Sequence, residues 1–234
     1  MRKWLRGSRA VRQSRLMRKF YSSLLPKNAL VFDVGANVGT MTQVFTSLGA
    51  RVIAVEPNPD CARHIELTTS RKNVEVLQAA VGERNGLAVL KVSDRKDKMS
   101  SLSDEWRDAV SKENPGYLGM WKRERTVPIV SLDALIERYG TPFYIKIDVE
   151  GYEEQVLQGL SVMPRLLSFE FSRLYLSPVL RSLGSAILSG ATFNYTLVDP
   201  VKLELNRWVS GSELREKLLS LGGAAGLGDI FARR

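Results

Sequence analysis

An apolar run that leads straight into a glycine turn is the feature that most constrains the fold of this chain. The run from Val31 to Gly39 reads Val-Phe-Asp-Val-Gly-Ala-Asn-Val-Gly, and a second run, Val-Ile-Ala-Val-Glu, ends at Glu56. Gly35 and Gly39 lack a Cβ atom, so the backbone can approach a ligand there and bend back into a helix. Glu56 follows Gly35 by 21 residues, about the interval at which a βαβ unit places a carboxylate opposite a ribose diol. The pattern predicts a nucleoside-bearing cofactor bound by an α/β fold.

Apolar periodicity places strands and helices in alternation along the rest of the chain. This alternation favours an open, mostly parallel sheet with helices on both faces, whose ligands bind beyond the carboxyl ends of the strands. The expected helices cover residues 40–48, 60–71, 152–160, 177–190 and 212–221. The expected strands cover residues 30–34, 51–56, 74–81, 87–92, 127–130, 143–149, 166–171, 193–198 and 229–233.

The scarcity of cysteine and histidine narrows the chemistry. With one cysteine, Cys61, and one histidine, His64, the chain can build neither a disulfide framework nor a zinc site of several Cys or His ligands. His64 falls in an expected helix and is assigned an ordinary surface or half-buried role. No apolar run approaches the ~20 residues of a membrane span, and a reducing, cytoplasmic compartment is expected.

The net charge of +9 originates in an N-terminal leader, residues 1–29. Nine Lys and Arg residues precede Asp33, the first acid, while the other 25 basic residues balance 25 acids. A helix over about residues 10–25 would gather apolar side chains on one side, namely Met17, Phe20, Tyr21 and Leu24. Two interpretations stay open: the leader packs on the core, or it attaches to an anionic membrane surface or acidic polymer. Because the leader is Arg-rich and acid-free, mitochondrial targeting is a further alternative.

A polar stretch over residues 93–125 is too long for a plain connection in a compact domain. Ser103 is expected to cap a short helix that carries Trp106 and Val110, and the aromatic residues Tyr117 and Trp121 follow it. We interpret this stretch as a lid over the substrate. The alternative is a surface excursion that packs its tryptophans on the edge of the sheet.

Charged residues interrupt the apolar strand expected at 143–149. Lys146, Asp148 and Glu150 recur at period two, so they are expected to point to one face. Because an unpaired buried charge is costly, Lys146 is expected to meet a carboxylate on an adjacent strand, Asp33 or Glu170. Asp148 and Glu150 arrive at the carboxyl end of the strand. There they could accept a proton from a substrate hydroxyl, hold a divalent cation or cap the following helix.

Several short motifs, taken in this order and spacing, form the most specific signal in the chain. They are Phe32-Asp-Val-Gly-Ala-Asn-Val-Gly39, Val55-Glu-Pro57, Ser131-Leu-Asp133, Lys146-Ile-Asp-Val-Glu-Gly151, Val156-Leu-Gln-Gly159 and Phe169-Glu-Phe171. Together they resemble the FkbM family of S-adenosylmethionine-dependent methyltransferases. The resemblance runs from about Leu30 to the C-terminus, and its motifs do not cover the leader or residues 93–125.

The resemblance implies a fold and a cofactor site. The fold is a class I methyltransferase domain over residues 30–234: a Rossmann-like three-layer α/β sandwich with an N-terminal helix. Its mostly parallel seven-stranded sheet has strand order 3-2-1-4-5-7-6 and an antiparallel last strand. The glycine turn faces the methionine part of S-adenosylmethionine, Glu56 takes the ribose hydroxyls, and residues 78–80 lie near the adenine. The assigned cofactor-binding residues are Asp33, Gly35, Ala36, Asn37, Gly39, Thr40, Glu56, Pro57, Gln78, Ala79 and Asp148.

Methyl transfer also fits the charged residues. The enzyme positions donor and acceptor for an in-line displacement, and a base is needed because an alcohol is a poor nucleophile. Asp148, Glu150 and Lys146 are assigned catalytic roles, with Asp148 or Glu150 as the base. A divalent metal held by these acids is the alternative, and it is not expected to be essential. The expected reaction is O-methylation of a hydroxyl on a sugar, glycan or natural-product intermediate.

Three other functions remain to be weighed. A nucleic-acid methyltransferase would suit the basic leader, but no Asn-Pro-Pro-Tyr run follows the expected strand at 143–149 to hold a flipped base. A nicotinamide dehydrogenase is disfavoured, since Asn37 stands between the two glycines and no Tyr-x-x-x-Lys pair is present. A non-catalytic binding protein that kept the fold would not bind S-adenosylmethionine in a titration.

Overall fold

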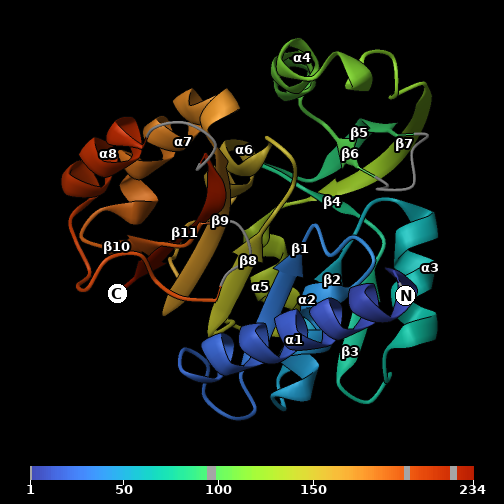
Figure 1. Cartoon of the computed structure of the whole chain (residues 1–234), viewed down its shortest axis with the longest axis horizontal. Coiled ribbons are helices and arrows are strands. Elements are labelled where there is room, and N and C mark those ends of the chain that lie inside the picture. Colours follow the sequence, from blue (N-terminus) through green and yellow to red (C-terminus); the bar gives the residue numbers. More distant parts are fainter. Residues whose placement is uncertain (1, 94–98, 198–200, 222–225) are drawn as a thin grey trace.

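A seven-stranded sheet forms the centre of the molecule, in the order β10-β11-β9-β8-β1-β2-β3 (Figure 1). The computed structural model describes residues 2–93, 99–197, 201–221 and 226–234, with side chains from residue 11 onward. The strands are β1 (Leu30–Val34), β2 (Arg51–Val55), β3 (Val74–Leu77), β8 (Tyr144–Ile147), β9 (Leu166–Ser172), β10 (Thr192–Tyr195) and β11 (Leu227–Arg233). β11 runs antiparallel to both β9 and β10, and the pairs from β3 to β9 are parallel. The expected strand order and the antiparallel last strand are confirmed.

Helices cover both faces of this sheet. Alternate residues of β1 face opposite layers: Val31 joins an apolar cluster with Phe45 of α2 (Thr40–Ser47), while Phe32 joins one with Leu132 of α5 (Leu132–Tyr139). α1 (Arg2–Ser22) and α3 (Pro59–Thr68) lie on the α2 face, and the remaining helices lie on the α5 face. Those helices are α6 (Glu153–Gln158), α7 (Leu176–Leu183) and α8 (Gly211–Ser220). The result is the expected three-layer sandwich.

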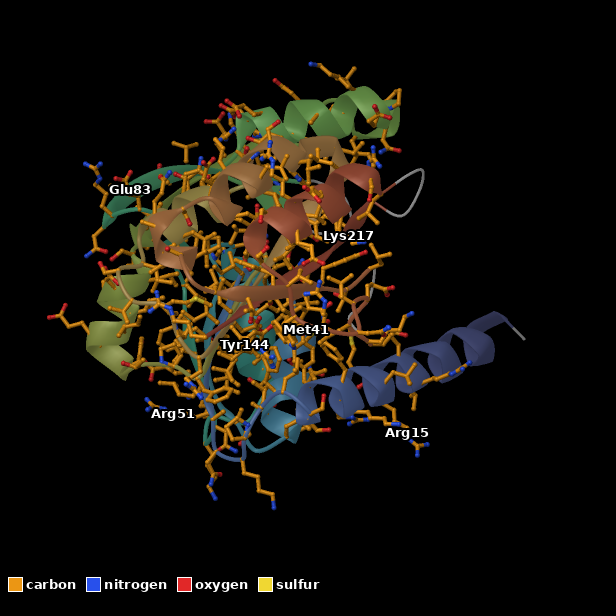
Figure 2. All side chains as sticks on the ribbon, turned by 90° about the vertical axis from the view of Figure 1, so that its left-hand side faces the viewer. Arg15, Met41, Arg51, Glu83, Tyr144 and Lys217 are labelled. Atoms are coloured by element: carbon orange, nitrogen blue, oxygen red, sulfur yellow. The ribbon has the colours of Figure 1, made fainter. Side chains whose placement is uncertain are left out.

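The N-terminal helix packs on the sheet through its second half. Met17, Phe20 and Tyr21 are buried, and the Phe20 ring meets the rings of Tyr21 and Phe231 edge to face at 5.0 and 5.6 Å. These three apolar residues of the leader therefore belong to the core, whereas Val11 and Leu16 are exposed. Figure 2 shows the first half of α1 projecting beyond the body of the protein, with Arg15 pointing away from it. No helix in the described part of the chain is long and apolar enough to cross a membrane.

A second, four-stranded sheet, β4-β7-β5-β6, lies beside the carboxyl ends of the central strands (Figure 1). Its strands are β4 (Ala80–Val81), β5 (Gly86–Val92), β6 (Ser100–Ser101) and β7 (Arg123–Val130), and it carries α4 (Asp104–Glu113) and the short helix η1 (Pro115–Tyr117). Ser103 caps α4 by accepting a hydrogen bond from the Trp106 amide, and Trp106 and Val110 are buried, as expected.

Two expectations about this region are wrong. The strand expected at 74–81 is two strands in different sheets, because Ala80 leaves β3 and pairs with Ile129 of β7. The polar stretch 93–125 includes the beginning of β7, which pairs with β5 although its first four side chains are exposed. A strand is recognised in a sequence by alternating apolar and polar residues, and this alternation is missing where the side chains on both faces are exposed. Residues 94–98 of this stretch, residue 198 of the strand expected at 193–198 and residues 222–225 lie outside the described part.

Candidate active site

The turn between β1 and α2 needs its first glycine for packing. Gly35 and Gly39 have φ angles of 77° and 79°, and Asn37 between them has 50°. A Cβ atom on Gly35 would lie 1.8 Å from the carbonyl oxygen of Asp148, and one on Gly39 would lie 3.0 Å from Cγ1 of Ile65. The close approach at Gly35 is therefore to the segment that follows β8, whereas the sequence suggested approach to a ligand.

Glu56, which directly follows β2, joins two turns. Its two carboxylate oxygens accept hydrogen bonds from the backbone amides of Asn37 and Asn58, each at 2.8 Å. Burial raises the pKa of Glu56 to about 7, although these two hydrogen bonds act to lower it. The acid predicted to face a ribose thus also holds the glycine turn against the turn after β2.

A cleft of about 680 Å³, its open mouth included, lies at the carboxyl ends of β1, β2 and β8, and we call it the central cleft. Predicted site residues that line it are Gly35, Asn37, Glu56, Pro57, Ala79, Asp148 and Glu150. Predicted residues outside its lining are Asp33, Ala36, Gly39, Thr40, Gln78 and Lys146. Lining residues that the sequence did not suggest include Leu90, Ser100, Leu102 and Tyr152. The first three of these come from the second sheet and the segment that follows β6, whose position the sequence did not reveal.

Lys146 and Asp148 form an ion pair beside this cleft, with the Lys146 side chain buried and the Asp148 side chain 35% exposed. The Lys146 ammonium lies 2.6 Å from Oδ2 of Asp148. The expected meeting with a carboxylate on an adjacent strand is confirmed for Asp33 as an electrostatic neighbour, while the ion-pair partner is Asp148. Asp33 neighbours Lys146 in the register of β1 and β8, and it accepts a 2.6 Å hydrogen bond from the Thr42 hydroxyl. Burial alone would lower the pKa of Lys146, but Asp148, Asp229 and Asp33 together raise it well above its ordinary value. Lys146 therefore holds Asp148 from outside the lining of the cleft, and Asp33 adds a second negative charge beside the lysine.

Glu150 occupies an uncommon backbone conformation. Because β8 ends at Ile147, the period-two pattern does not continue through Asp148 to Glu150, which has a φ of 56°. Its carbonyl oxygen accepts a 2.7 Å hydrogen bond from the Ser101 hydroxyl. The next residue, Gly151, has a φ of 91°, and a Cβ atom there would lie 2.3 Å from Trp106. The second sheet thus holds this turn from both sides.

Glu153, rather than Glu150, satisfies the amides at the start of α6. Its Oε1 accepts hydrogen bonds from the amides of Val149 at 3.1 Å and Gly151 at 3.3 Å. Burial raises the pKa of Glu153 to about 7. The capping role considered for Glu150 thus falls to a residue that the sequence did not single out.

A second cleft of about 960 Å³, which we call the outer cleft, opens between α4 and the ends of β9 and β11. Its walls include Trp106 and Val110 of α4, Glu170 of β9 and Arg173 of the short helix η2 (Arg173–Tyr175). Glu150 lines both this cleft and the central cleft. A hydrogen bond of 2.6 Å from the Tyr175 hydroxyl to Glu105 joins η2 to α4. The two clefts therefore meet at Glu150.

The remaining titratable residues that the sequence singled out lie elsewhere. His64 is exposed on α3, as expected, and Cys61 is buried with its Sγ atom 3.6 Å from Oδ1 of Asn37. Among the described residues, no group of three or more His, Cys, Asp or Glu side chains could hold a metal ion.

The strand order, the glycine turn and a cleft at the carboxyl ends of the central strands together define a class I methyltransferase. More specifically, the chain belongs to the FkbM methyltransferase family, since the profile of the Methyltransferase FkbM domain matches residues 33–175. It is 28% identical over 134 residues to the hexuronic acid methyltransferase AglP of Haloferax volcanii, an alignment that covers 56% of this chain and 50% of AglP.

A solved structure shows the same fold. The methyltransferase FkbM from Methylobacillus flagellatus superposes with a TM-score of 0.50 at 16% sequence identity, covering 90% of this chain and 45% of that one. The chain spans about half the length of both relatives. Family and fold support S-adenosylmethionine as the methyl donor.

Proposed function

We propose that the protein is an S-adenosylmethionine-dependent O-methyltransferase whose acceptor is a hydroxyl of a sugar, glycan or natural-product intermediate. The observation that carries the proposal is the position of Glu150, at the junction of a cleft suited to the donor and a second cleft open to solvent. The name of the relative AglP, a hexuronic acid methyltransferase, supports a sugar as the acceptor.

The central cleft suits the donor. Its lining combines apolar side chains with a few polar groups, as ordinary small-molecule sites do. Glu56 stands at the tip of β2 to accept hydrogen bonds from ribose hydroxyls, and Ala79 and Leu90 offer apolar surface to the adenine. Asp148, held by Lys146, then lies at the tip of β8, nearest to the sulfonium group.

Glu150 is our choice of base. In the reaction the acceptor oxygen bonds to the methyl carbon while the carbon–sulfur bond breaks, and the donor leaves as a neutral thioether. The hydroxyl proton passes to a carboxylate. Asp148 is the weaker candidate because, among the described lining residues, it lines the central cleft alone, whereas Glu150 lines both clefts.

Substitution of Glu150 tests this assignment. E150Q is expected to reduce kcat by about 10²- to 10⁴-fold, the usual contribution of a general base, while the Kd of the donor is retained. The matched variant D148N leaves Lys146 buried without its partner, so it should weaken donor binding and lower the melting temperature. If E150Q transferred the methyl group at the wild-type rate in single-turnover assays with saturating donor, Glu150 would not be the base.

Labelled methyl transfer into fractionated cell extract tests the function itself. We expect counts in carbohydrate that survive dilute alkali, as a methyl ether does, and that persist in the presence of a chelator. Alkali-labile counts would indicate methylation of a carboxylate. Counts in nucleic acid, or no transfer and no donor binding, would refute the proposal.

A further inference from the structure

We propose that the outer cleft is the acceptor site and that Arg173 selects acceptors in which the sugar ring carries a carboxylate. This inference rests on the proposed function and goes further, because it names the site, the substrate class and the residue that distinguishes a uronic acid from a neutral sugar. Three observations support it: the position of the cleft, the chemistry of its walls, and the absence of an ion pair between Arg173 and any described residue.

The outer cleft lies next to the central cleft, with which it shares Glu150. A molecule in the outer cleft therefore lies next to the end of β8, where the donor methyl is expected. Its walls are the segment around Trp106 on one side and the ends of β9 and β11 on the other. The cleft is open to solvent, so a sugar ring can enter it while the rest of a glycan stays outside.

The walls combine apolar surface with a few polar groups. Trp106, Val110, Leu174 and Leu227 provide the apolar surface that the CH faces of a sugar ring require. The side chain of Glu170 forms no hydrogen bond with any described residue, while its backbone belongs to the ladder of β9 and β11. Burial, followed by the carboxylates of Asp148, Glu150, Glu153 and Asp229, raises the pKa of Glu170 well above its ordinary range. A protonated Glu170 can both donate to and accept from ring hydroxyls.

Arg173 is the one arginine in the described lining of the outer cleft, and it forms no ion pair with any described residue. Its backbone amide donates a 2.6 Å hydrogen bond to the carbonyl of Gly226. A Cβ atom on Gly226 would lie 2.8 Å from Cβ and 2.9 Å from Cγ of Arg173, so the first part of the side chain is held against β11. An arginine fixed at its base, with an unpaired guanidinium, is suited to a carboxylate by paired hydrogen bonds.

The test compares a uronide with its neutral counterpart on the full chain, in the presence of S-adenosylhomocysteine. The probes are the methyl glycosides of glucuronic and galacturonic acid and those of glucose and galactose, with Kd measured by saturation-transfer NMR. The wild type should bind at least one uronide about tenfold or more tighter than the matching neutral sugar, as expected of a charge-assisted hydrogen bond pair. R173Q should abolish this preference, and R173K should restore part of it.

Arg165 provides the matched control. It is exposed at the opposite end of β9, so R165Q should keep the wild-type preference. R173Q should also retain the melting temperature and the donor Kd, because Arg173 lies outside the central cleft. Equal binding of uronide and neutral sugar by the wild type, binding of neither, or a preference that survives R173Q would overturn the inference. If a sugar is methylated but Arg173 is without effect, the proposed function stands and only this inference fails.

Discussion

Gly35 is required for two reasons: its positive φ angle and the lack of space for a side chain. Its φ of 77° is a conformation that costs other residues about 1–2 kcal/mol, and its missing side chain makes room for the carbonyl of Asp148. Asp148 could not approach β1 so closely if Gly35 had a side chain. The glycine therefore sets the distance between the donor turn and the segment that carries the reactive carboxylates.

Gly49 allows the effect of a positive φ angle to be measured separately from the effect of crowding at the Cβ position. It has a φ of 84°, but a Cβ atom there would meet nothing within 4 Å. We expect G49A to lower the free energy of unfolding by about 1–2 kcal/mol, and G35A to lower it by more than twice as much and to abolish donor binding. Urea unfolding and a donor titration measure both effects. Equal losses in the two variants would show that the contact with Asp148 is unimportant.

Part of the lining of the central cleft could be predicted from the sequence, residue by residue. Gly35, Glu56, Asp148 and Glu150 stand at the ends of strongly apolar strands, so pattern and spacing were sufficient to find them. Arg173 was not predicted, because an exposed arginine after a strand has no distinguishing pattern. Asp33 was correctly expected beside Lys146, but the ion-pair partner of the lysine, Asp148 two residues later, was not.

At the scale of elements, α1 shows how a charged helix can also belong to the core. Phe20 is 8% exposed and lies between the rings of Tyr21 and Phe231, whereas Val11 is 68% exposed. F20A is expected to lower the free energy of unfolding by about 3 kcal/mol or more, and V11A by less than about 0.5 kcal/mol. Chemical denaturation provides the comparison. If the two variants are equally stable, the packing of α1 on the sheet is not an important contribution.

Most helices with one buried face were predicted, but α5 was not, although it buries Leu132 and Leu135. α2, α3, α6 and α8 lie within a few residues of their expected positions because of their apolar stripes, and α3 and α8 also have side-chain caps. β7 was only partly found, since Arg123, Glu124, Arg125 and Thr126 are all exposed and gain their structure from backbone pairing with β5. Pairing between distant segments leaves no periodic trace in a polar stretch.

At the scale of the whole molecule, the topology was predicted more accurately than the site. Alternating strands and helices favour a parallel sheet covered on both faces, and the family resemblance supplied the strand order and the reversed last strand. Neither the apolar periodicity nor the family resemblance predicted the second sheet beside the carboxyl ends of β1 and β8. Its four strands pair with one another through residues that mostly lie outside the family motifs. That sheet nevertheless supplies a wall of the central cleft, and α4, which it carries, supplies a wall of the outer cleft.

The whole molecule should also be more stable at mildly acidic pH. Burial raises the pKa of Glu56 and of Glu153 to about 7 and that of Asp229 to about 6. An acid with a pKa higher in the folded than in the unfolded chain stabilises the fold below its unfolded pKa, and this contribution is lost as pH rises through the folded value. The free energy of unfolding is therefore expected to fall between about pH 5 and 7, by up to about 1.4 kcal/mol per pH unit for each group.

Variants of two glutamates test the source of this pH dependence. E153Q should make the decline shallower, because Gln can still accept hydrogen bonds from the amides of Val149 and Gly151 but does not titrate. Glu137 on α5 is exposed, so E137Q should leave the slope unchanged. Urea unfolding at several pH values measures the slope. A stability that rises from pH 5 to 7 would contradict the prediction.

The hydrogen bond from Ser101 to Glu150 has a consequence for protein engineering. The second sheet together with α4 is an attractive module to exchange between relatives when a new acceptor is wanted, because the sheet lines the central cleft and α4 lines the outer cleft. Yet Ser101 and Trp106 also hold the left-handed turn at Glu150 and Gly151. A graft that replaces residues 86–130 without these two side chains would change the acceptor pocket and misalign the proposed base in the same step. Chimeras should therefore be cut outside this contact, so that Ser101, Trp106 and the 148–153 turn are inherited from one parent.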